Sequence, residues 1–168
     1  MRYYGFDAGW EGCVHKAREK FHNKRQFSFT ISSSPSDLKI LNRESATLVL
    51  ALETLEHIPP EILDEYLRKL YEIMMPNAYF IITVPNEKGL IFFFKYVIKS
   101  LIYGDAYAMT LKEFCAAIFG KTVLIERGTH KGFDWESLVD QLERYYNIVK
   151  VEGIQVKYLP PGLMLLLE

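Results

Sequence analysis

The sequence predicts an α/β fold built on a largely parallel sheet, and three observations support this prediction. First, short apolar stretches alternate with amphipathic helical patterns along most of the 168 residues. Second, the run from Thr47 to Pro85 holds a buried strand, a charged turn, an amphipathic helix and another buried strand, in the order of a parallel crossover unit. Third, two β-rich stretches close in sequence end the chain, which is typical of an antiparallel edge hairpin.

The N-terminal part supplies two predicted strands and a helix. An aromatic strand runs over residues 2–6 and ends at Asp7, and a charged helix follows over 9–21. Residues 26–31 alternate aromatic and polar side chains and favour a second strand. The stretch SSSPSD at 32–37 has the composition of a loop.

The rest of the chain continues the alternation, and we found no linker, so a single domain over 1–168 is expected. Pro59 and Pro60 indicate a helix start, and Thr110 with Glu113 has the spacing of a capping box. Asp134 is a third predicted cap. The predicted helices are 60–74, 90–102, 111–119 and 135–146, and the predicted strands are 48–52, 79–84, 148–158 and 163–167.

Composition narrows the classes of function. Lysine and arginine total 20 and acidic residues 21, so the formal net charge of -1 gives no indication of nucleic-acid binding. Cys13 and Cys115 lie far apart, which fits a reducing, cytoplasmic location without a disulfide framework. The longest apolar stretch, 90–103, contains two lysines and is too short for a stable membrane anchor.

Three segments together resemble a known enzyme family. They are YYGFDAGWEGCVHKARE at 3–19, LVLALETLEHIP at 48–59 and MMPNAYFIITVPNE at 74–87. In this order they resemble the second, fourth and fifth strands of S-adenosylmethionine-dependent methyltransferases with a Rossmann-like fold. Within that family the resemblance is to the ubiquinone-type group, or methyltransferase type 11 or 12. The resemblance implies helices on both faces of the sheet and S-adenosylmethionine as the cofactor, with S-adenosylhomocysteine as the product.

The resemblance also implies which residues bind the cofactor. Asp7, at the end of its strand, would accept hydrogen bonds from the ribose hydroxyls, which an ionised carboxylate binds strongly. The alternative is that Asp7 only caps the following helix. The predicted cofactor-binding residues are Asp7, Ala8, Ser33, Ser34, Leu38 and Glu53.

The charged turn carries the predicted catalytic side chains. Glu53, Glu56 and His57 are spaced i, i+3 and i+4, so they would share a face if the turn were helical. We prefer the interpretation that this turn borders the active site. His57 would be the general base, because the unperturbed pKa of histidine lies near neutrality. A divalent metal held by the three residues is the weaker alternative. His130 is the third catalytic candidate, with Glu53 and His57; an exposed loop histidine without a role is its alternative.

Two segments would shape the acceptor pocket, namely the apolar helix 90–103 and the loop 128–134. The helix has three interpretations: a lid over an apolar substrate, an interfacial helix on anionic lipid, or a core helix with two snorkelling lysines. The implied reaction is methyl transfer to an oxygen or nitrogen of a small or lipid-linked acceptor.

One family feature is not found in the sequence. No GxGxG-like turn joins a strand to a helix, and the strand that precedes it in the family has no counterpart before Tyr3. We therefore expect an N-terminally truncated domain with impaired methyl transfer and exposed strand edges. A homo-oligomer or another chain could fill those edges. The alternative function is a non-catalytic, degenerate methyltransferase module that acts by binding a partner.

Overall fold

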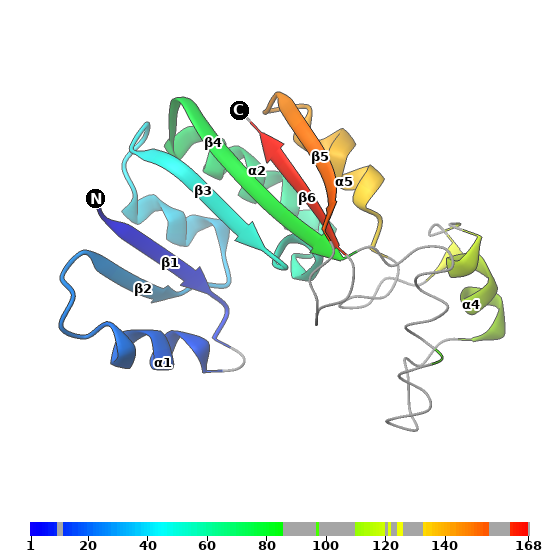
Figure 1. Cartoon of the computed structure of the whole chain (residues 1–168), viewed down its shortest axis with the longest axis horizontal. Helices are drawn as coiled ribbons and strands as arrows, with labels where there is room; N and C mark the ends of the chain where they lie inside the picture. Colours follow the sequence, from blue (N-terminus) through cyan, green and yellow to red (C-terminus); the bar gives the residue numbers. More distant parts are fainter. Residues whose placement is uncertain are drawn as a thin grey trace. The chain divides into compact units, whose positions relative to one another are not determined.

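The computed structural model describes residues 1–9, 12–85, 97, 110–119, 121, 124–125, 133–154 and 162–167. They belong to two compact units, Met1–Asn42 and Arg43–Glu168, each with its own sheet (Figure 1). The α/β prediction is confirmed, and the single domain stays a prediction. The predicted helix 90–102, His130 and most of the loop 128–134 lie outside the described residues.

The first unit is a parallel strand pair with one helix. Strands β1 (Tyr3–Asp7) and β2 (Phe27–Ile31) pair so that Asp7 lies opposite Ile31, and helix α1 (Cys13–Lys20) connects them. Aromatic stacking supports the pair, with ring centroids 4.7 Å apart for Tyr3 and Phe27 and 4.5 Å apart for Phe21 and Phe27. Both predicted strands are confirmed, and the helix is shorter than expected.

The predicted loop at 32–37 is wrong in part, because a short 3-10 helix, η1, forms over Pro35–Ile40. Ser34 precedes it in extended conformation, and its Oγ accepts from the Ser36 N–H at 3.3 Å. The Asp37 carboxylate accepts from the Ser34 N–H at 3.3 Å, and Pro35 opens the helix. Serine and proline therefore start a helix here instead of a loop.

The second unit contains a four-stranded sheet in the order β3-β4-β6-β5 (Figure 1). Strands β3 (Ala46–Leu52) and β4 (Met74–Pro85) are parallel, whereas β6 (Gly162–Leu167) is antiparallel to both β4 and β5 (Ile148–Ile154). The antiparallel pairing of the last two strands is confirmed. Strand β5 forms the edge of the sheet, and β6 lies inside it.

Strand β4 begins five residues earlier than the predicted strand 79–84. The predicted Pro76-Asn77 turn is taken up inside the strand, with Asn77 in the left-handed region at φ 63°. The pairing with β3 shifts between Ala46 and Leu48, as expected when extra residues are accommodated on one strand.

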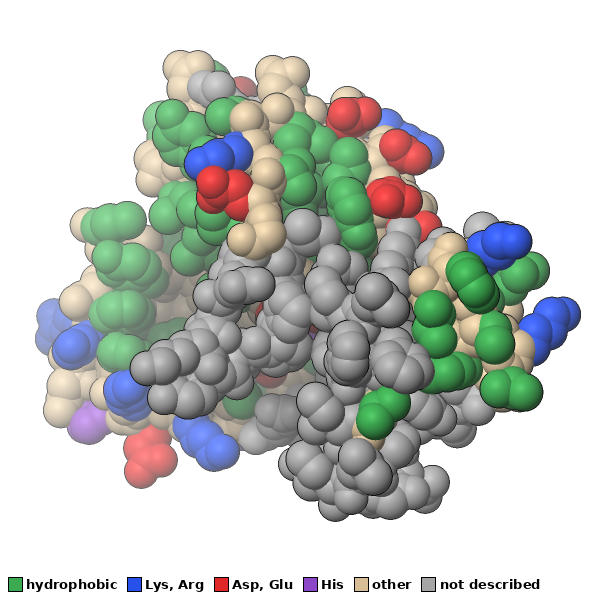
Figure 2. All heavy atoms as spheres, turned by 45° about the vertical axis from the view of Figure 1, so that its right-hand side comes forward, with side chains coloured by type: hydrophobic (Ala, Val, Ile, Leu, Met, Phe, Trp, Pro, Cys, Tyr) green, Lys and Arg blue, Asp and Glu red, His purple; other side chains and the backbone are tan. Residues whose placement is uncertain are grey.

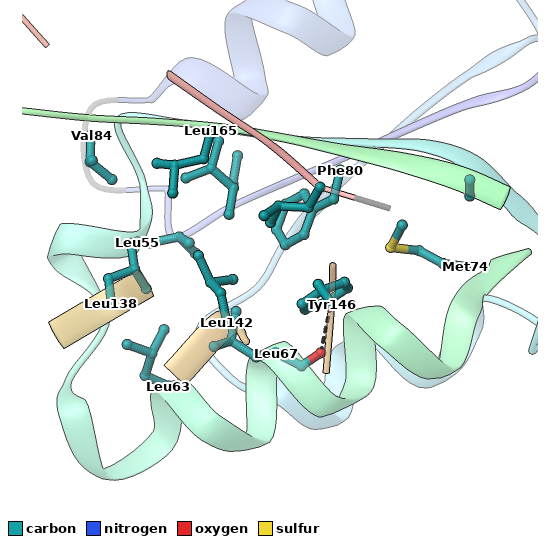
Figure 3. Close-up of a cluster of buried hydrophobic side chains, with 14 of the residues drawn as sticks. Leu55, Leu63, Leu67, Met74, Phe80, Val84, Leu138, Leu142, Tyr146 and Leu165 are labelled. Atoms are coloured by element: carbon teal, nitrogen blue, oxygen red, sulfur yellow. Dashed lines mark hydrogen bonds between the residues drawn. The ribbon is translucent and has the colours of Figure 1, made fainter. Parts of the chain in front are cut away.

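Helices α2 (Pro60–Ile73) and α5 (Trp135–Leu142) cover one face of this sheet, and α5 ends four residues before the predicted end. Figure 3 shows Leu63 and Leu67 of α2 and Leu138 and Leu142 of α5 packed with Phe80 and Leu165 of the strands. Burial of these side chains is the main source of stability. Tyr146 closes the core by donating to the Leu67 carbonyl at 2.8 Å, and burial raises the pKa of its phenol.

The opposite face of the sheet is apolar and open at β3. Leu48, Leu50, Leu52 and Tyr79 alternate with the buried residues and are exposed. The prediction of helices on both faces is therefore borne out for one face by the described residues, and for the other it stays a prediction.

Helix α4 (Leu111–Ile118) follows Thr110, and its predicted capping box with Glu113 is confirmed. Leu111 at its start and Phe119 directly after its end are exposed, and Figure 2 shows hydrophobic side chains gathered over this helix. None of the helices in the described part of the chain has the length and apolar composition needed to span a bilayer.

Candidate functional site

Asp7 ends β1 in a turn that leaves its carboxylate exposed. Its Oδ1 accepts from the Gly9 N–H at 2.7 Å, and its carbonyl accepts from the Ser32 N–H at 2.9 Å. Gly9 has φ 81°, where a side chain would be strained, and an added Cβ would lie 3.2 Å from Ile31. Helix α1 is preceded by Gly12 and has no side-chain cap, so the alternative of Asp7 as helix cap is not what the structure shows.

The predicted adenine-side residues follow the neighbouring strand. Because β1 and β2 are parallel, Asp7 and the segment after Ile31 lie at the same end of the sheet. Ser33 is exposed there, Ser34 is half-buried in the η1 cap, and Ala8 is half-buried beside Asp7. Leu38 is buried with only 5% of its surface exposed, so its side chain belongs to the interior of this unit.

Glu53 ends β3 in a left-handed conformation, with φ 50°. Its N–H donates to both the carbonyl oxygen and the Oγ1 of Thr83, each at 3.0 Å, which joins the ends of β3 and β4. Thr54 Oγ1 donates to the Leu52 carbonyl at 3.0 Å. These bonds hold a residue type that rarely adopts this backbone conformation.

Glu56 and His57 lie in the short 3-10 helix η2 (Leu55–His57), after the Glu53 turn. Glu56 is buried, with 1% exposed, whereas Glu53 is exposed and the His57 side chain is 27% exposed. The Glu56 Oε1 lies 3.8 Å from the His57 Nε2. A buried carboxylate thus stands beside a partly accessible imidazole, an arrangement that can orient the ring.

The three residues do not form the shared helical face that the spacing suggested. Glu53 has left-handed backbone dihedrals and precedes the helical turn, so the i, i+3, i+4 rule does not apply to it. Within the described ranges, no three histidine, cysteine, aspartate or glutamate side chains are grouped so that they could hold a metal ion. Glu53, Glu56 and His57 are therefore not a preformed metal site.

The structure brings the predicted residues together in two groups, one in each unit. Asp7, Ser33 and Ser34 share the end of the β1–β2 pair, and Glu53, Glu56 and His57 share the end of the β3–β4 pair. Sequence reasoning missed Gly9 and Thr83, which fix the two turns. The available signals were a glycine two residues after an acid and a hydroxyl inside the apolar run IITVP.

Comparisons with known proteins identify the fold. No protein-family model matches the chain. No curated protein matches its sequence either. Solved structures do match, and among them are S-adenosylmethionine-dependent methyltransferases. The chain has the Rossmann-like fold of that class of enzyme, as its strand order and motifs predicted.

Three of these structures illustrate the match. One is N-methyltransferase NodS from Bradyrhizobium japonicum in complex with S-adenosylhomocysteine, with TM-score 0.59 and 10% identity over 99% of this chain and 65% of that one. Another is the 1,6-didemethyltoxoflavin-N1-methyltransferase of Burkholderia thailandensis with bound 1,6-didemethyltoxoflavin and S-adenosylhomocysteine, with TM-score 0.59 and 12% identity over 99% of this chain and 60% of that one. The third is a methyltransferase from Methanosarcina mazei, with TM-score 0.61 and 12% identity over 98% and 80%.

Proposed function

We propose that this chain binds S-adenosylmethionine and takes part in methyl transfer to an oxygen or nitrogen of a small or lipid-linked acceptor. The fold supports this, as do the S-adenosylhomocysteine complexes of two similarly folded enzymes. The observation that carries the proposal is the exposed Asp7 carboxylate at the end of a parallel strand, where ligands of open α/β sheets bind.

The residues at this position fit the adenosyl part of the cofactor. The Gly9 N–H fixes Asp7 by one oxygen, which leaves the exposed carboxylate able to accept hydrogen bonds from two neighbouring ribose hydroxyls. Ser33 and the backbone of the segment before η1 would border the adenine. Bound there, the cofactor would supply an activated methyl group.

His57 and Glu53 would act on the acceptor substrate. His57 would take the proton from an acceptor hydroxyl or amine, and the buried Glu56 beside it would stabilise the imidazolium that forms. Glu53, exposed at the end of β3 in the same unit, is the second candidate on the acceptor side. Most of the rate enhancement would come from alignment of the nucleophile with the methyl group, for which the Thr83 bonds to Glu53 fix the turn.

The proposal is tested by calorimetric titration of the full chain with S-adenosylhomocysteine. Binding is expected, and Asp7→Ala should weaken it about tenfold or more, because charge-assisted hydrogen bonds are lost. Glu19→Ala is the matched control, since it removes an exposed carboxylate from α1 of the same unit. Absence of binding by a folded chain, or equal loss in both variants, would contradict the proposal.

A non-catalytic module that acts by partner binding is the second candidate. The observation that favours it is the exposed apolar side of β3, with Leu48, Leu50 and Leu52 on one face. It predicts a folded chain that does not bind S-adenosylhomocysteine, so the same titration separates the two candidates.

A further inference from the structure

The two edges of the four-stranded sheet differ in chemistry. At one edge, β5 places Lys150 and Glu152 on the open face, where they form an ion pair at 2.6 Å. At the other edge, β3 has the sequence ATLVLAL over 46–52, with no charge and no proline. Charges and proline are the devices by which natural edge strands avoid pairing with another strand, so the β5 edge is protected and the β3 edge is not.

The unprotected edge also carries exposed apolar side chains. Leu48, Leu50 and Leu52 are exposed by 43%, 55% and 56%, and the face continues onto Tyr79 of β4 at 47%. Within the described residues of this unit, β3 pairs on one side only, with β4. Its other row of backbone N–H and C=O groups is therefore available for hydrogen bonds with a further strand.

The sequence of β3 is nearly symmetric about Val49. Leu48 and Leu50 flank it, and Thr47 and Ala51 follow on either side. A two-fold axis through Val49 would place Leu48 of one copy opposite Leu50 of the other on the open face, and Thr47 opposite Ala51 on the helix-covered face. Arg43 and Glu44 precede the strand and Glu53 follows it, so antiparallel pairing brings charges of both signs beside each other at the strand ends.

We propose that β3 pairs antiparallel with β3 of a second copy of this chain, which joins two four-stranded sheets into one. The proposal rests on the second unit alone and does not depend on methyl transfer. It predicts a symmetric dimer whose interface is the edge and open face of β3.

The test is sedimentation velocity of the full chain over a wide range of concentration. The wild type should dimerise, and Leu50→Lys should weaken the dimer roughly tenfold or more, because it places a charge opposite Leu48 of the second copy. Val149→Lys is the matched control, since it makes the same charge change at an exposed position of the β5 edge and should leave the dimer intact.

Hydrogen exchange keeps the proposal testable even if Leu50→Lys fails to fold. In the wild type, protection of the β3 amides should rise with protein concentration, while that of the β5 amides should not. A wild-type monomer at every concentration would overturn the proposal. So would β3 amides whose protection is independent of concentration, because that result would mean that another part of the same chain covers the edge.

Discussion

The turns that follow β1 and β3 both contain a left-handed residue, but they accommodate it in different ways. Each ends a parallel strand and contains a left-handed residue, Gly9 with φ 81° in the first and Glu53 with φ 50° in the second. In the first turn, glycine adopts this conformation without strain, and the Asp7 carboxylate stays exposed. In the second, the strained Glu53 is held by Thr83, and the next carboxylate, Glu56, is buried.

Under the proposed function, the two turns have different roles. The turn after β1 presents an accessible acceptor group on a relaxed backbone, which suits ligand binding. The turn after β3 fixes its backbone with two hydrogen bonds and places a buried carboxylate 3.8 Å from His57, which suits the positioning of a base. The predictions below test each part of this contrast.

The largest effect is expected at Glu56. Glu56→Ala should lower the free energy of unfolding by about 2–4 kcal/mol, because it opens a cavity and removes a buried polar group from its contacts. Urea unfolding measures this loss. Asp7→Ala, the corresponding change in the exposed turn, should cost about 1 kcal/mol or less. Equal losses in the free energy of unfolding for the two variants would contradict the difference between the two turns.

Gly9→Ala should destabilise the first turn by about 1–2 kcal/mol, because the left-handed backbone disfavours a side chain and the new Cβ would press on Ile31. Gly12→Ala is the control, because Gly12 has φ 68° but nothing within 4 Å of the added Cβ. The two variants therefore share the backbone cost. If urea unfolding shows equal losses, the contact with Ile31 contributes nothing.

Thr83→Val removes the side-chain bond to the Glu53 N–H and keeps the shape of the residue. The expected loss is about 1 kcal/mol, since the Thr83 carbonyl still accepts from the same N–H. Thr47→Val, at an exposed position of β3, should change stability by less. Thermal unfolding compares the two variants, and a larger loss for Thr47→Val would contradict the role assigned to Thr83.

The smallest effect is a gain in stability. Glu53→Gly should relieve the left-handed strain and stabilise the chain by about 0.5 kcal/mol, a figure that includes the added entropy of an unfolded glycine. The Glu53 side chain is exposed among the described residues, so little packing is lost with it. A clear loss of stability on chemical unfolding would show that Glu53 makes contacts that outweigh its strain.

The sequence predicted more of the fold than of the site. Hydrophobic patterning located β1, β2, β3, α2 and β6 because their apolar periodicity follows from burial, and the caps at Thr110 and Asp134 are local signals. The left-handed conformation of Glu53 was not predicted, because it depends on a hydrogen bond to Thr83, thirty positions away in the chain. The helix η1 was missed because its serines and proline have the composition of a loop.

The most direct test of the different roles of the two turns is the affinity of two variants for S-adenosylhomocysteine, measured by calorimetry. Asp7→Asn keeps the shape of the side chain but removes the charge that strengthens its hydrogen bonds, and His57→Gln removes the proposed base from the other turn. We predict that Asp7→Asn weakens binding about tenfold, whereas His57→Gln leaves it within about twofold of the wild type. Weaker binding by His57→Gln than by Asp7→Asn would contradict the account.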